Sequence, residues 1–94
     1  MQSGGRKIRS STLLLLVGRG EGALTRVGLT VSRKVGIAVI RNRVKRWLRE
    51  AVRAVGAPPG GPWDVVIIAR AESASAGYEA LRGEVATMFS RVRP

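Results

Sequence analysis

The sequence predicts a small α/β (α+β) two-layer sandwich, in which helices cover one face of a small sheet. Short apolar runs rich in branched side chains predict strands, and two longer stretches with apolar residues at helical spacing predict helices. Breaks rich in glycine and proline separate these elements. We expect the 94 residues to form a single domain with a modest core, in which residues 1–10 are frayed or start a strand.

Two strands are predicted in the N-terminal half of the chain. Thr12–Val17 is a short apolar run, and a turn with three glycines follows it. Leu24–Ser32 then alternates between apolar and polar residues, which is the pattern of a strand with one buried face. Because only the short turn separates the two runs, we expect them to pair as a hairpin.

The longer of the two helices is predicted over Ala38–Val55. Its apolar residues recur in steps of three and four along one face, and Gly56 with the proline-rich segment after it should end the helix. The apolar stripe consists of Ile40, Val44, Trp47, Leu48, Ala51 and Val55.

A further strand and a second helix complete the expected fold. Trp63–Ala69 is almost continuously apolar and rich in β-branched residues, which predicts a central strand that is buried on both faces or largely covered. The last helix is expected from about Ala76 to Val92, with Ser73 or Ser75 as its N-cap. Its core-facing residues are expected to be Tyr78, Leu81, Val85, Met88, Phe89 and Val92.

The composition argues against catalysis by the chain's own side chains. It has 17 Lys and Arg against 6 Asp and Glu, a net charge of +11, and neither His nor Cys. The usual general base, thiolate metal ligands and disulfides are therefore excluded. The few carboxylates are scattered, with no pair spaced for a two-metal site. We expect no catalytic and no metal-binding residue, and the lack of cysteine fits a cytoplasmic protein.

A targeting signal is not indicated either. Leu13–Val17 follows three cations and loosely resembles a signal peptide, but it is shorter than the roughly 7–15 apolar residues of a secretory core. No window approaches the about 20 apolar residues of a membrane span. The run is therefore interpreted as part of a buried strand.

The polar face of the 38–55 helix constrains function most. On a helical wheel its cations lie opposite the apolar stripe, with Arg43 at the edge of that stripe. Eight of the 17 cations lie between residues 33 and 53, beside a single acid, Glu50. The candidate binding residues are Arg33, Lys34, Arg41, Asn42, Arg43, Lys45, Arg46, Arg49 and Arg53.

This charge pattern differs from that of an ordinary solvated helix, which mixes Glu with Lys because such i,i+4 pairs are stabilising. Here cations follow cations at positions 41, 45, 49 and 53, and each such pair costs a few tenths of a kcal/mol. Arginine outnumbers lysine six to two in this stretch, and its guanidinium group binds phosphates through two hydrogen bonds. We therefore expect the helix to bind nucleic acid.

The stretch from Arg33 to Arg46 resembles the signature of the bacterial ribonuclease P protein component. The core of the match is Arg41-Asn42-Arg43 followed by Lys45-Arg46, and the resemblance covers roughly residues 5–92. The flanking matches are Val27–Ser32 to the strand before the motif, Asp64–Arg70 to the strand after it, and Tyr78–Phe89 to the closing helix.

The resemblance implies an accessory RNA-binding subunit of a ribonucleoprotein endoribonuclease that removes the 5′ leader from precursor tRNA. The RNA subunit would carry out the hydrolysis and hold the Mg²⁺ that it requires. The protein would bind that RNA through its basic helix and contact the leader on its sheet face. The implied partners are ribonuclease P RNA and precursor tRNA, with no DNA and no membrane. The family fold has a mixed sheet and an unusual left-handed βαβ crossover.

The sequence departs from the family pattern in places. Members usually carry a further N-terminal helix that forms one wall of the leader cleft, and this chain begins near the end of that element. Leu16 stands where an aromatic is expected on the cleft face, and Ile37 replaces the more usual Asn. Trp63, the one aromatic outside the two helical stripes, could pack in the core or stack on a base.

Two other classes of protein share parts of the pattern. A different basic α/β RNA-binding module, such as a ribosomal-protein-like domain, would have the same charge without a nuclease role. A membrane-surface protein could use a basic amphipathic helix, but here the apolar stripe continues into a core with strands and a second helix.

Overall fold

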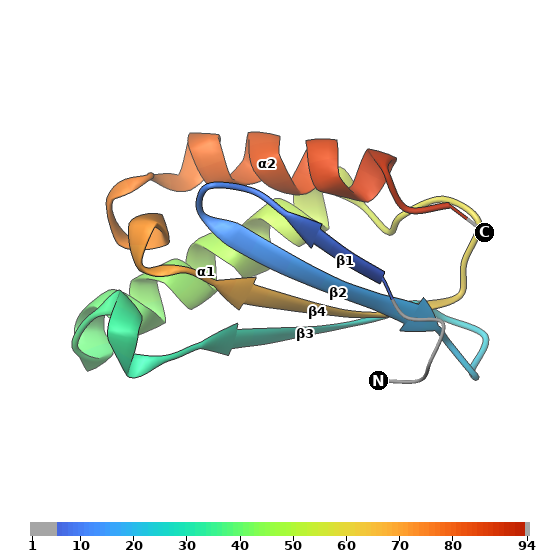
Figure 1. The fold of residues 1–94 in the computed structure, drawn as a ribbon, viewed down its shortest axis with the longest axis horizontal. Coiled ribbons are helices and arrows are strands. Elements are labelled where there is room, and N and C mark those ends of the chain that lie inside the picture. The colour runs from blue at the N-terminus through green and yellow to red at the C-terminus, as the bar shows by residue number, and fades with distance from the viewer. Residues whose placement is uncertain (1–5, 94) are drawn as a thin grey trace.

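A computed structural model describes residues 6–93 as one four-stranded sheet with two helices on one of its faces, which confirms the predicted fold class (Figure 1). The elements are β1 (Arg6–Arg9), β2 (Leu13–Arg19), β3 (Arg26–Val31), a 3₁₀ turn η1 (Arg33–Val35), α1 (Ala38–Val55), β4 (Trp63–Ala69), a 3₁₀ turn η2 (Ala71–Ser75) and α2 (Tyr78–Ser90). Residues 6–9 thus form a strand and are not frayed, whereas the rest of that expectation, for residues 1–5, lies outside the described residues.

The strand order in the sheet is β1-β2-β4-β3. Strand β2 is antiparallel to β1 and to β4, and β3 is parallel to β4. The predicted hairpin between β2 and β3 is therefore wrong, because β4 lies between them. The hairpin that does form joins β1 to β2, and its turn is closed by Ser10, whose Oγ accepts a hydrogen bond from the Leu13 N–H at 3.0 Å. The apolar β4 takes the central position, where both of its edges are paired.

The connection from β3 through α1 to β4 is left-handed. In the view of Figure 1 both strands run to the left, α1 lies behind the sheet, and β4 lies above β3. Crossovers between parallel strands are right-handed in about 98% of cases. The resemblance implied this left-handed crossover. The basic helix α1 is the segment that connects β3 to β4.

The core lies between the sheet and the helices, as the apolar patterns predict. Leu13, Leu15 and Ile67 of the sheet and Leu48 and Leu81 of the helices are fully buried. Each such side chain contributes about 1.5–3 kcal/mol by leaving water. The predicted stripes of both helices face this core, with only Ile40, Trp47, Val55 and Tyr78 partly exposed at its margins.

The helix ends agree with the sequence at one point and differ at another. Gly56 ends α1 as predicted, with a φ of 84° and its N–H bonded to the Val52 carbonyl at 2.8 Å. By contrast α2 begins after Gly77, whose φ is 86°, and no side chain caps it. Neither Ser73 nor Ser75 is the N-cap. Ser73 is fully buried in η2, where its hydroxyl donates to the Arg70 carbonyl at 2.7 Å.

Candidate nucleic-acid interface

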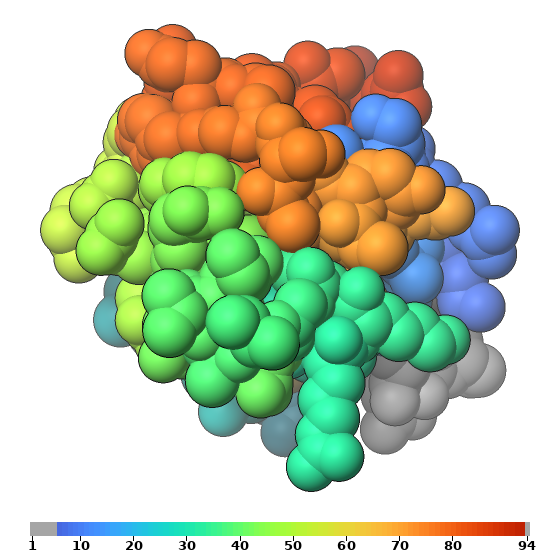
Figure 2. All heavy atoms as spheres, turned by 90° about the vertical axis from the view of Figure 1, so that its left-hand side faces the viewer, coloured from blue at the N-terminus to red at the C-terminus, as the bar shows by residue number. Residues whose placement is uncertain are grey.

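Positive charge gathers where α1 begins. The helix follows Ile37, whose side chain is 72% exposed and provides no capping hydrogen bond, and its first turn contains no acid. The positive end of the helix dipole therefore adds to the charge of Arg33 and Lys34, which are exposed on η1. Figure 2 shows this end of the molecule, with the start of α1 (green) beside η1 (turquoise).

Four exposed polar side chains of α1 form an outer row that consists of Asn42, Arg46, Arg49 and Arg53. They follow one another in steps of four, three and four residues, so they lie on one line along the helix. Arg41 and Lys45 are only half-exposed and lie beside this row. Of the 41, 45, 49 and 53 line seen in the sequence, only Arg49 and Arg53 are therefore fully exposed.

Arg41 has a structural contact that sequence reasoning missed. Its Nε donates a hydrogen bond to the carbonyl oxygen of Gly36 at 3.1 Å, which ties the loop after η1 to the first turn of α1. Gly36 has a φ of 153°, and a Cβ there would come within 3.0 Å of the Ile40 side chain. The terminal nitrogens of Arg41 remain available for phosphate. In the sequence, the only signal for this hydrogen bond is the position of Gly36 five residues before Arg41.

Arg43 is positioned by a tryptophan on the next turn. Its guanidinium carbon lies 5.1 Å from the centroid of the Trp47 ring, within the range of a cation–π contact. Stacking orients a guanidinium group while leaving its edge free to donate hydrogen bonds. Arg43 thus lies on a different side of α1 from Arg41, and the signature residues spread over more than one flank of the helix.

Carboxylates of the described residues form no ion pair with these cations. Within residues 6–93 the ion pairs are Arg26 with Asp64 and Arg82 with Glu79, and neither includes a candidate binding residue. Glu50, the one acid on α1, forms no ion pair in this part of the chain. All nine predicted residues lie on η1 and α1, and the eight cations among them form no ion pair within residues 6–93. A polyanion would compensate this charge.

Comparison with known proteins indicates the same family as the sequence motif. The family model described as Ribonuclease P matches residues 1–93. The chain belongs to the ribonuclease P protein family. A ribonuclease P protein component from Gluconacetobacter diazotrophicus is 44% identical over 85 residues, 88% of this chain and 73% of that protein. One from Dehalococcoides mccartyi is 58% identical over 52 residues, 55% of this chain and 42% of that protein.

A solved structure, the ribonuclease P protein from Thermotoga maritima, shares the fold with a TM-score of 0.84 at 27% identity, covering 96% of this chain and 86% of that one. Members of the ribonuclease P protein family are accessory subunits of a tRNA-processing ribonucleoprotein endoribonuclease, in which the RNA carries the chemistry.

The face of the sheet opposite the helices is a second surface of interest for a ribonuclease P protein. Neither helix lies on this face, which is turned to the viewer in Figure 1. Its centre is aliphatic and half-buried, and cations of β1 flank it. The residues concerned are Leu14 and Leu16 of β2, Val66 and Ile68 of β4, and Lys7 and Arg9 of β1. β4 is therefore central, as predicted, but it is fully buried on one face only.

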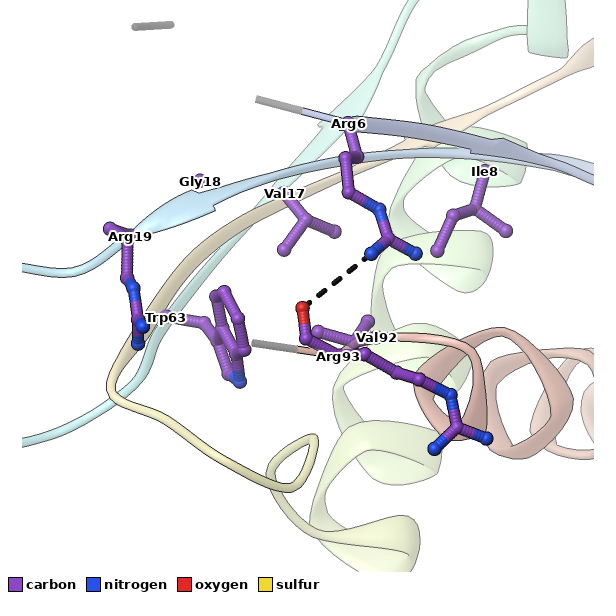
Figure 3. Close-up of a pocket in the computed structure, with 8 residues that line it drawn as sticks. All are labelled: Arg6, Ile8, Val17, Gly18, Arg19, Trp63, Val92 and Arg93. Atoms are coloured by element: carbon purple, nitrogen blue, oxygen red, sulfur yellow. Dashed lines mark hydrogen bonds between the residues drawn. The ribbon is translucent and has the colours of Figure 1, made fainter. Parts of the chain in front are cut away.

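At the opposite end of the sheet from η1, a pocket of about 190 Å³ lies beside the C-terminal segment (Figure 3). Trp63 forms one wall, is 5% exposed, and donates its indole N–H to the Pro59 carbonyl at 2.9 Å. Arg19 lies over that ring, 5.2 Å from its centroid, and Arg6 donates to the Arg91 carbonyl at 2.9 Å. Trp63 is thus a core residue, and these two arginines make contacts within the fold.

No three His, Cys, Asp or Glu side chains of residues 6–93 lie close enough together to hold a metal ion. Over the same stretch, the structure contains no helix with the length and apolar character needed to cross a bilayer.

Proposed function

We propose that the basic surface of η1 and α1 binds the RNA subunit of ribonuclease P, and that the assembled enzyme removes the 5′ leader from precursor tRNA. The observation that supports this is the unpaired charge: eight cations and Asn42 lie at and directly after the family motif, and none of the cations has a carboxylate partner within residues 6–93. The residues are Arg33, Lys34, Arg41, Asn42, Arg43, Lys45, Arg46, Arg49 and Arg53.

The geometry supports different tasks for these residues. The cations of the outer row would neutralise successive phosphates, because they are exposed and aligned. Asn42 can donate to a phosphate or a 2′-hydroxyl from the same row. Arg43, which stacks on Trp47, would bind a base or a phosphate on the flank of α1 where these two side chains lie. A-form RNA presents its phosphates and 2′-hydroxyls on its surface. Binding through these groups therefore depends on the shape of the RNA more than on its base sequence.

The leader of precursor tRNA would lie on the open face of the sheet. Lys7 and Arg9 offer charge there, and the aliphatic centre offers contact to bases. Stacking on an aromatic is worth about 1–3 kcal/mol per base, and Leu16 offers no such ring. We therefore expect leader binding to this face to depend more on charge than on stacking.

The proposal assigns the required Mg²⁺ to the RNA subunit, because the described residues do not fit a metal site. It also places the protein in the cytoplasm, with no role for DNA or a membrane. The alternative is a generic basic RNA-binding module that does not act in leader removal.

Reconstitution tests the proposal. The chain is combined with a bacterial ribonuclease P RNA and a precursor tRNA at low Mg²⁺, and release of the 5′ leader is followed. Cleavage that requires both protein and RNA is the expected result. Arg46→Gln should weaken RNA binding and cleavage, whereas Arg82→Gln, which lies on α2 and pairs with Glu79, should change neither. Tight RNA binding without stimulation of cleavage would favour the generic module, and absence of binding would overturn the proposal.

A further inference from the structure

A small pocket lies between the outer side of β3 and α1. Val27 and Leu29 of β3 and Val52 of α1 form its apolar walls, and Arg49 and Arg53 line it as well. Its volume is about 280 Å³. Sites for drug-sized ligands occupy roughly 300–1,000 Å³, so this pocket suits a smaller body such as one planar ring system.

The β3 side of the pocket offers hydrogen bonding as well as apolar contact. β3 is at the edge of the sheet and pairs only with β4 within residues 6–93. The N–H and C=O groups of alternate residues on its outer edge therefore have no strand partner. Main-chain donors and acceptors beside an apolar pocket can bind the polar edge of a planar heterocycle.

The α1 side of the pocket carries charge of one sign. Arg49 and Arg53 belong to the outer row, and the lining contains no acidic side chain. Guanidinium groups stack on planar bases and bind phosphates through two hydrogen bonds. Apolar walls, edge donors and two arginines together match the three parts of a nucleotide.

We infer that this pocket takes one unpaired nucleotide of the RNA subunit, with the base between β3 and α1 and its phosphates on Arg49 and Arg53. The inference rests on the proposed function, because the outer row that would hold the RNA subunit continues directly into the pocket. A second copy of the chain is a poor occupant, since each copy carries a net charge of +11. The same charge favours RNA over most peptides.

The test compares equal bulk inside and outside the pocket. Val52→Trp fills the pocket from a half-exposed helix position, and Val52→Ala removes one of its walls. Ala54→Trp is the matched control, because Ala54 is exposed two residues further along α1 and therefore lies on a different side of the helix. Each variant is checked for an unchanged thermal midpoint. Affinity for ribonuclease P RNA is measured, and the Watson–Crick edges of unpaired bases are probed chemically with and without protein.

The expected result is protection of one unpaired base by the wild-type protein and by Ala54→Trp. Val52→Trp should expose that base again and bind about tenfold more weakly. Val52→Ala should weaken binding about threefold, which RNA lying flat over the helix would not cause.

Two outcomes would contradict the pocket assignment while leaving the proposed function intact. One is an identical footprint and affinity for Val52→Trp and the wild type. The other is an equal loss for Val52→Trp and Ala54→Trp, because bulk anywhere on α1 would then be responsible. Failure of the wild-type protein to bind the RNA at all would overturn both proposals.

Discussion

Replacement of Arg49 by Gln should weaken RNA binding and make the free protein more stable. Arg49 has Lys45 and Arg53 four residues away on α1 and Arg46 three residues away, and none of these cations has an ion-pair partner within residues 6–93. Each like-charge pair at this spacing costs about 0.2–0.5 kcal/mol. Glutamine and arginine have similar helix propensities. Loss of three repulsive pairs should therefore stabilise the protein by about 1 kcal/mol, or ~4–8 °C in Tm.

RNA binding should change in the opposite direction. Loss of one phosphate contact should reduce the slope of log K against log salt by about 0.7–0.9, and loss of one charge-assisted hydrogen bond should lower affinity about tenfold. Thermal unfolding and salt-dependent filter binding measure the two effects. Arg82→Gln is the control, since its loss of the Glu79 contact should slightly lower stability and leave RNA binding unchanged. A destabilised Arg49→Gln variant, or one with an unaltered salt slope, would refute the reasoning.

Three further predictions concern other parts of the molecule. Ile37→Asn should supply the missing N-cap of α1 and stabilise the protein by about 1 kcal/mol, visible as a higher Tm; no shift would mean that the helix start is satisfied in another way. Leu48→Ala should cost about 2–5 kcal/mol in denaturant unfolding, because Leu48 is fully buried, and a loss below 1 kcal/mol would contradict the core assignment. Lys7→Gln combined with Arg9→Gln should raise KM for precursor tRNA at low salt without changing affinity for the RNA subunit. An equal loss of affinity for precursor tRNA and for the RNA subunit would contradict the assignment of these residues to the leader.

The sequence predicted the elements well because their signals are local. The bounds of α1 agree with the structure at both ends, since the spacing of its apolar residues and Gly56 lie within the helix or next to it. The central strand over Trp63–Ala69 was likewise predicted at its observed bounds. Strand neighbours were not predictable in this way, because alternation indicates which face is buried and not which strand lies alongside. Arg26 of β3 pairs with Asp64, 38 residues further along the chain.

The same distinction holds for the binding surface. The identity and helical placement of its cations follow from the sequence and the motif. The hydrogen bond from Arg41 to Gly36 and the stacking of Arg43 on Trp47 depend on side-chain conformation, which periodicity does not report. The apolar pocket beside Arg49 could not be predicted either, because it exists only where the edge strand meets the helix.

The position of β4 in the middle of the sheet has a consequence for synthesis of the chain. Until Trp63–Ala69 leaves the ribosome, β2 and β3 have no common partner, and β1 with β2 is the only strand pair of the described sheet that can form. In an isolated α1 the neighbouring cations repel one another, and the helix gains most of its stability by packing against the rest of the protein. The nascent chain therefore presents a flexible polycation first and a shaped RNA-binding surface only once its last third arrives.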